Sequence, residues 1–157
     1  MTIHKDVEAL RRIPLFARID PARLKLLAFT SDRLHFEPGE RLCSEGEPGD
    51  AAFIILEGTA RVLVRTPEGE LEVARLGEHA IVGEIAILCN VPRTATVEAA
   101  TPVTVLRISK DGFLHLVSQF PQIAVEMMSE LARRLHRTTQ QLKEVTSRLQ
   151  KLEEARH

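Results

Sequence analysis

The stretch PGERLCSEGEPGDAAFIILEGTARVLVRTPEGELEVARLGEHAIVG, residues 38–83, decides the fold class because turns and short β-prone runs alternate throughout it. It holds seven of the eight glycines in the chain of 157 residues, in turns such as PGE, EGEPGD and EGT. RVLVR (residues 61–65) alternates as a strand does, and TATVEA and VTVLRI (94–99 and 103–108) add two further runs. Closely spaced short strands with glycine-rich turns predict a sandwich or a β-roll.

Both flanks of the β region have helical patterns. Asp20 followed by Pro21 is a favourable helix start, and VEALRR near the N-terminus predicts a second, shorter helix. Ser109 is expected to cap KDGFLHLVSQF, and Pro121 to open a helix that continues to the end of the chain. We therefore predict one α+β domain over residues 1–157. It comprises N-terminal helices (1–30), a double-stranded β-helix or jelly-roll-like β-roll (31–108), and C-terminal helices (109–157).

Composition excludes several classes of function. The chain is 44% hydrophobic and 27% charged with a formal net charge of -1, so it lacks the basic excess of a nucleic-acid-binding protein. Its longest apolar run, AAFIIL (51–56), is too short to span a bilayer, and the N-terminal residues contain no apolar signal region. We expect a cytoplasmic protein with no nucleic acid partner and no membrane span. Cys43 and Cys89 are too few for a four-thiolate metal site and are expected to be free thiols.

The last helix carries a heptad pattern. Its seam residues follow one another at alternating spacings of three and four, which is the signature of a coiled coil. They are Met128, Leu131, Leu135, Thr138, Leu142, Val145, Leu149 and Leu152. In this register Arg148 and Glu153 occupy the g and following e positions, which pair across a parallel dimer. The alternative is that the leucines cover the β-roll, but a helix of about 36 residues is roughly 50 Å long, so a small roll covers only part of it. A parallel homodimer is therefore expected.

Two charged residues stand out in the otherwise apolar segment VGEIAILCNVPRTATVEAA, residues 82–100. A carboxylate such as Glu84 accepts hydrogen bonds from sugar hydroxyls, and a guanidinium such as Arg93 forms bidentate bonds with phosphate oxygens. Gly83 lets the backbone approach a ligand, and EIAIL can form one helical turn whose N–H groups face an anion. The segment therefore predicts a site for a ribose and a phosphate. The alternative is that the two charges pair with each other or with solvent.

The same segment resembles the phosphate-binding cassette of the cyclic nucleotide-binding domain family, which includes the effector domain of the catabolite activator protein. The resemblance covers nearly the whole chain. IPLFARIDPARLKLLA (13–28) resembles the N-terminal helical segment of the family, residues 36–62 its glycine-marked β-roll, and residues 108–135 its closing helices. A pattern of this length is far more specific than a short motif.

The resemblance implies a role for each matching residue of the cassette, residues 82–97. Glu84 would bind the ribose 2'-hydroxyl, and Arg93 would bind the cyclic phosphate. Backbone groups around Gly83, Ile85, Ala86 and Ala95 would complete the phosphate cradle.

The resemblance also implies roles for three threonines. Thr94 is compatible with cyclic AMP and can also help to hold the guanine of cyclic GMP, so the choice of nucleotide stays open. Thr138 and Thr139 lie in LARRLHRTTQQL (131–142), which resembles the helix whose hydroxyl groups meet the base from both subunits. This role would explain a polar residue in an apolar seam.

The chain also departs from the family's transcription factors, which continue into a winged helix-turn-helix, because it ends at His157 directly after the long helix. We therefore expect a stand-alone, non-enzymatic sensor of cyclic AMP or cyclic GMP that passes a conformational change to an unknown partner protein. No metal or cofactor is expected, since the six histidines are scattered and no set of ligands suits a metal, haem or iron–sulfur centre. The alternative function is a ligand-free dimeric scaffold, and the intact pair of Glu84 and Arg93 argues against it.

Overall fold

The computed structural model describes residues 2–13 and 16–156, including the side chains of all of these except residues 2–4 and 85. It forms two compact units, Met1–Gln119 and Phe120–His157. The first unit contains two four-stranded antiparallel sheets with helices before and after them. The predicted α+β β-roll with flanking helices is thereby confirmed.

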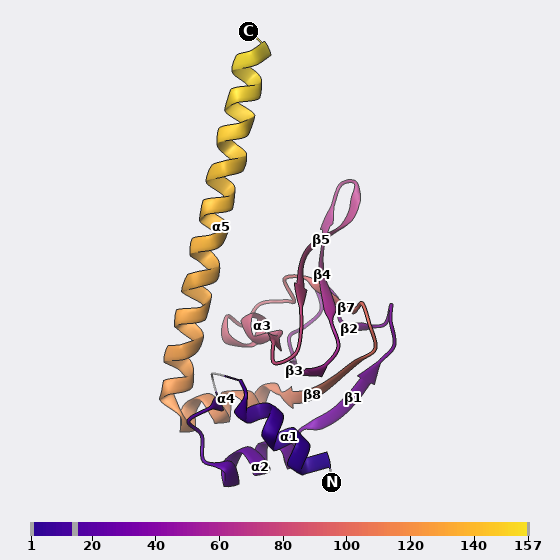
Figure 1. Cartoon of the computed structure of the whole chain (residues 1–157), viewed down its shortest axis with the longest axis vertical. Coiled ribbons are helices and arrows are strands. Elements are labelled where there is room, and N and C mark those ends of the chain that lie inside the picture. Colours follow the sequence, from indigo (N-terminus) through magenta and orange to yellow (C-terminus); the bar gives the residue numbers. More distant parts are fainter. Residues whose placement is uncertain (1, 14–15, 157) are drawn as a thin grey trace. The chain divides into compact units, whose positions relative to one another are not determined.

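The two sheets interleave strands from distant parts of the sequence. The strands are β1 (Asp32–Phe36), β2 (Arg41–Cys43), β3 (Ala51–Glu57), β4 (Ala60–Thr66), β5 (Gly69–Leu76), β6 (Ile81–Val82), β7 (Thr96–Ala99) and β8 (Val103–Ser109). One sheet has the order β1-β8-β3-β6, and the other has the order β2-β7-β4-β5. In Figure 1 the hairpin of β4 and β5 extends beyond the other strands. The 44–50 loop joins the end of β2 to the start of β3, and the segment after β6 also begins at a strand end. Side chains of both sheets can meet there.

The core lies between the two sheets. Phe53 and Ile55 on β3 and Val105 on β8 are at most 4% exposed, and they form one apolar cluster with residues of β2, β6 and β7. β3 is buried along nearly its whole length because α3 (Glu84–Leu88) and α4 (Lys110–Gln119) also pack against it. This explains why AAFIIL is continuously apolar rather than alternating.

The helices of the first unit, except the first, begin where the sequence predicts. Asp20 caps α2 (Pro21–Thr30), and its Oδ1 accepts a hydrogen bond from the Ala22 N–H at 3.2 Å. α1 (Thr2–Arg11) contains most of the predicted VEALRR segment but starts earlier, and it packs against α2. The Ser109 Oγ accepts the Gly112 N–H at 3.1 Å, so the predicted cap of α4 is also confirmed. These caps satisfy N–H groups that a helix start otherwise leaves unpaired.

The second unit consists mainly of α5 (Pro121–Arg156), a single helix of 36 residues. Most of the predicted seam lies at its surface. The seam residues that expose more than half of their area are Met128, Leu135, Leu142, Val145, Leu149 and Leu152. Thr138 is also exposed. The coiled-coil dimer remains a prediction. Within the described part of the chain, no helix combines the length and the apolarity that crossing a membrane requires.

Candidate functional site

Gly83 sits at the centre of the candidate site. It follows β6 and turns the chain into α3 with a φ of 87°, in the left-handed region that favours glycine. A side chain here would collide with Nη1 of Arg93 and would crowd the Ala51 carbonyl oxygen. The absence of a side chain at residue 83 therefore lets the Arg93 guanidinium lie against the start of α3.

The backbone of Arg93 holds the loop between β2 and β3, residues 44–50. The Arg93 N–H donates to the Glu47 carbonyl at 2.8 Å, and the Arg93 carbonyl accepts the Gly46 N–H at 2.9 Å. The loop is fixed at its other end as well, because the Lys110 N–H donates to the Asp50 carbonyl at 2.9 Å. Arg93 thus brings the predicted cassette and this loop together, a contact between segments more than 40 residues apart in the sequence.

The Arg93 side chain is only 3% exposed. Its Nη2 donates to the Ala51 carbonyl at 2.7 Å, and its Nη1 donates to the Gly83 carbonyl at 3.2 Å. Its Cζ also lies 5.8 Å from the centre of the Phe53 ring, within the range of a cation–π interaction. A buried charge is tolerated only where hydrogen bonds and a counter-ion compensate it. The backbone carbonyls supply most of this compensation.

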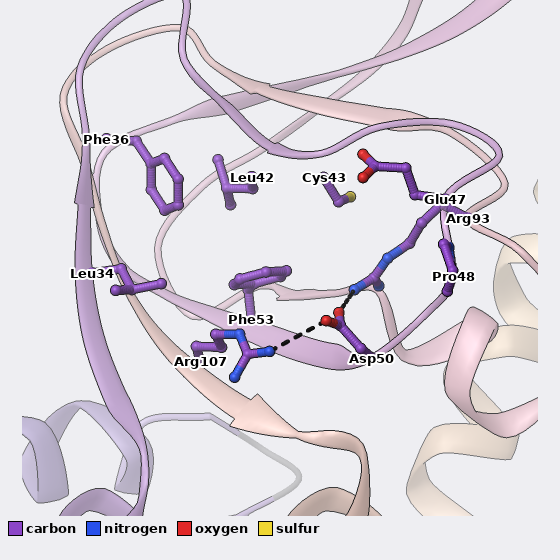
Figure 2. Close-up of a pocket in the computed structure, with 10 residues that line it drawn as sticks. All are labelled: Leu34, Phe36, Leu42, Cys43, Glu47, Pro48, Asp50, Phe53, Arg93 and Arg107. Carbon is purple, nitrogen blue, oxygen red and sulfur yellow. Dashed lines mark hydrogen bonds and ion pairs between the residues drawn. The ribbon is translucent and has the colours of Figure 1, made fainter.

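Asp50 supplies the counter-ion, and it does so loosely. Its Oδ1 lies 3.4 Å from Arg93 Nη2, and its Oδ2 lies 3.4 Å from Nη2 of Arg107 on β8. Both distances exceed the roughly 2.7–2.9 Å of a strong charge-assisted hydrogen bond. The Asp50 side chain is 73% exposed, so solvent screens both pairs. Figure 2 shows the Asp50 carboxylate between the two guanidinium groups.

The remaining residues of the predicted cassette lie around this centre. Glu84 is the first residue of α3, directly after Gly83, and is only 6% exposed. Ala86 is buried where α3 meets Gly49, at which even one added carbon would collide with it. Thr94 is exposed and Ala95 is half-buried. The backbone of Ile85 lies in α3, whereas its side chain lies outside the described residues.

The predicted base contacts at Thr138 and Thr139 belong to the second unit. Both threonines are exposed on α5, and the Thr139 Oγ donates to the Leu135 carbonyl at 2.9 Å. Such bonding to the preceding turn is common for a helical threonine and needs no ligand. Their role toward a base therefore stays a prediction.

A cavity of about 320 Å³, here called the β-roll cavity, lies beside Arg93 (Figure 2). Its apolar wall is formed by Leu34, Phe36, Leu42, Pro48 and Phe53. Its polar groups are Cys43, Glu47, Asp50, Arg93 and Arg107. The sequence analysis did not find Asp50, Phe53 and Arg107 as functional candidates. Their proximity to Arg93 depends on the pairing of β3 with β8, which no local motif records.

Cys43 contributes a free thiol to the cavity wall. Burial raises the pKa of its thiol, although the nearby Arg93 charge opposes this shift. The thiol therefore stays protonated at neutral pH. Both cysteines are free, with Cys43 half-buried and Cys89 exposed. Among the residues that the structure describes, no group of three or more His, Cys, Asp and Glu side chains is arranged to hold a metal ion.

A profile described as "Cyclic nucleotide-binding domain" matches residues 33–120, more than half of the chain, and contains Glu84, Arg93 and the whole β-roll cavity. The chain belongs to the cyclic nucleotide-binding domain family. The resemblance seen in the sequence is thereby confirmed. Membership also places the chain among regulatory domains rather than enzymes.

Known relatives of this cyclic nucleotide-binding domain include a curated transcriptional regulator. The CRP-like cAMP-activated global transcriptional regulator of Mycobacterium tuberculosis is 30% identical over 136 residues, which are 86% of this chain and 61% of that protein. The chain thus spans about three-fifths of the length of this curated relative.

Two solved structures have the same architecture. The sensor domain of the transcriptional regulator DNR from Pseudomonas aeruginosa matches with a TM-score of 0.76 and 24% identity, over 87% of this chain and 92% of that one, and this likeness shows the fold. The regulatory subunit of a cAMP-independent protein kinase A from Trypanosoma brucei matches with a TM-score of 0.70 and 27% identity, over 82% of this chain and 49% of that one.

Proposed function

We propose that this domain is a sensor that binds a 3',5'-cyclic nucleotide, cyclic AMP or cyclic GMP, and relays the binding event to a partner protein. The observation that carries the proposal is the placement of Arg93: a nearly buried guanidinium lies against Gly83, directly before Glu84 at the start of α3. The arginine beside Gly83 and the glutamate that follows Gly83 match the two parts of the ligand, an anionic phosphate and a ribose hydroxyl.

The chemistry of the site suits a monoanion. Arg93 is nearly buried, so its attraction for a phosphate is screened less than it would be at the surface. Its formal counter-ion, Asp50, is exposed and held at 3.4 Å, so a ligand oxygen can bond more closely than Asp50 does. Arg93 therefore offers a phosphate a fixed donor without requiring a tight internal ion pair to break.

The identity of the base is the finer part of the proposal. The Mycobacterium tuberculosis relative is activated by cyclic AMP, whereas the Trypanosoma brucei protein is described as cAMP-independent. The fold alone therefore does not choose the ligand. Thr94 is exposed beside Arg93 and carries a hydroxyl that suits either base.

Calorimetric titration of the purified chain with cyclic AMP and with cyclic GMP tests the proposal. We expect heat and a single saturable site with at least one of them, and 5'-AMP as a control should bind more weakly because its phosphate carries a second charge and is not cyclic. Absence of heat with both cyclic nucleotides, together with unchanged thermal stability, would leave the ligand-free scaffold as the better account.

We also propose that α5 forms a parallel homodimer. The proposal rests on the exposed seam, since Leu135, Leu142 and Leu149 recur every seven residues and each exposes more than half of its area. A soluble monomer rarely leaves such a continuous apolar stripe in water. Sedimentation equilibrium of the full chain should give a dimer. A monomer at the highest soluble concentration would contradict the heptad assignment.

A further inference from the structure

The β-roll cavity is lined by two guanidinium groups and by an apolar wall. This combination suits a class of ligand other than a nucleotide. We propose that the cavity binds a small amphipathic carboxylate, an aryl or aliphatic acid whose carboxylate lies between Arg93 and Arg107 and whose apolar body rests on Phe53. The cavity volume of about 320 Å³ is at the lower end of the range of small-molecule sites, roughly 300–1,000 Å³.

The apolar half of the cavity is built from both sheets. Leu34 and Phe53 belong to the sheet of β1 and β3, and Leu42 belongs to β2 in the facing sheet. Phe53 and Leu42 are buried, so the wall is continuous with the core rather than a surface patch. Figure 2 shows these side chains facing one another across the cavity. Such a wall favours a hydrocarbon or aromatic body over a sugar.

The charged half of the cavity contains two guanidinium groups and two carboxylates, Glu47 and Asp50, so a ligand anion has to take the place of Asp50 between the guanidinium groups. Arg93 and Arg107 both line the cavity, and each of them contacts Asp50 at 3.4 Å. The second acidic neighbour of Arg107, Asp32, is farther away at 3.7 Å and is 69% exposed. Because Asp50 is also largely exposed, its side chain can rotate into water at little cost. A ligand carboxylate at the same point would make shorter bonds to both guanidinium groups.

Of the residues predicted to bind the nucleotide, only Arg93 lines the cavity. Neither Glu84 nor Thr94 lines it, whereas Arg107 does. Arg107 therefore separates the two sites experimentally. The carboxylate proposal does not depend on nucleotide binding, so it can fail while the proposed function holds, and the reverse is also true.

The first experiment is a calorimetric titration of the full chain with 4-phenylbutyrate, an aryl acid, in the absence of nucleotide. We expect a dissociation constant below about 1 mM, and no detectable binding of 4-phenylbutyramide, which has nearly the same shape but no charge. Equal binding of acid and amide would show that the guanidinium groups do not recognise the ligand. That result, or the absence of binding by the acid, would overturn the proposal.

The second experiment locates the carboxylate with a matched pair of variants. Arg107→Gln should weaken 4-phenylbutyrate binding about tenfold or more, since it removes a charge-assisted hydrogen bond. Arg41→Gln is the control, because Arg41 lies on β2 and pairs with Glu70 away from the cavity. It should leave binding unchanged. Equal effects of the two variants would overturn the proposal, and so would an equal loss of nucleotide and acid binding in Arg107→Gln.

Cys43 provides an independent readout inside the cavity. In a Cys89→Ser variant, the remaining thiol lines the cavity wall, and saturating 4-phenylbutyrate should slow its modification by N-ethylmaleimide at alkaline pH by about threefold or more. The amide should give no protection. An unchanged rate in the presence of bound acid would place the acid elsewhere and would contradict the proposal.

Discussion

Replacing Arg93 with alanine should destabilise the protein even when no ligand is present. The side chain donates to the Ala51 and Gly83 carbonyls and lies over the Phe53 ring. A residue that serves only a ligand would leave the free protein unaffected. Because Arg93 connects the start of β3 with the turn before α3, we expect it to contribute to the fold as well as to the site.

The magnitude follows from the individual contacts. Loss of the buried bond to the Ala51 carbonyl, made at 2.7 Å by a charged donor, should cost about 1.5–3 kcal/mol. The longer bond to Gly83 and the Phe53 contact add about 0.5–1 kcal/mol each. Relief from burying the charge offsets part of this, and the exposed Asp50 pair adds almost nothing. We therefore expect a net loss of about 2–4 kcal/mol, which corresponds to a fall in Tm of roughly 5–12 °C.

Urea unfolding of the ligand-free protein, followed by circular dichroism, measures this loss directly. Asp50→Asn is the matched control, since it removes the counter-ion but leaves both carbonyl bonds, and its stability should stay within about 1 kcal/mol of the wild type. A stability loss below about 1 kcal/mol for Arg93→Ala would refute the structural role. A large loss in Asp50→Asn would show that the ion pair, rather than the carbonyls, stabilises the guanidinium. In the same Arg93→Ala protein, nucleotide affinity should fall by roughly 30- to 1,000-fold.

Four further outcomes are expected. Glu84→Ala should weaken binding of the ribose nucleotide and reduce its preference over the 2'-deoxy analogue, and calorimetry with both ligands would contradict this role if the full preference persisted. Gly83→Ala should destabilise the ligand-free protein by about 1–3 kcal/mol, because residue 83 has a φ of 87° and the added carbon would meet Arg93. Gly69→Ala is the control, since residue 69 lies at an open turn with a φ of 115° and its substitution carries only the backbone cost. Equal urea midpoints for the two variants would argue against a steric contribution at residue 83. Burial raises the pKa of Cys43, so as pH rises the thiol ionises first in the unfolded chain, and the free energy of unfolding should fall above about pH 8.5. Cys43→Ser should reduce this dependence of stability on pH, which urea midpoints across the same pH range would measure. Thr138→Leu should tighten the proposed dimer in sedimentation while lowering nucleotide affinity, and a weaker dimer would show that the heptad register is wrong.

Much of the fold could be predicted because its signals are local. The caps at Asp20 and Ser109, the helical turn EIAIL and the continuous apolar run at residues 51–56 each report a preference of a few neighbouring residues. The strand order could not be predicted in the same way. The sheet order β1-β8-β3-β6 joins strands from opposite ends of the roll, and these pairings depend on the packing of the whole core.

The candidate site shows the same division. Glu84 and Arg93 are recognisable because both lie in one short segment that resembles a known cassette. The residues around them are not, because Asp50 and Phe53 reach Arg93, and Arg107 reaches Asp50, only through the 44–50 loop and the pairing of β3 with β8. The sequence therefore indicates which groups would bind a ligand, whereas the structure indicates which groups hold them in place.

Arg93 is held in position before any ligand arrives. Its backbone is bonded to the 44–50 loop, and its guanidinium is fixed by two carbonyls, so an anion meets a side chain that has already lost its rotamer freedom, about 1.5–2 kcal/mol for arginine. Asp50 is exposed and held loosely by two arginines, so in the proposed complexes a bound anion displaces Asp50 more readily than it moves Arg93. The carbonyl of Asp50 accepts the N–H of Lys110, the first residue of α4. The side chain and the backbone of Asp50 thus connect the two guanidinium groups with the start of α4.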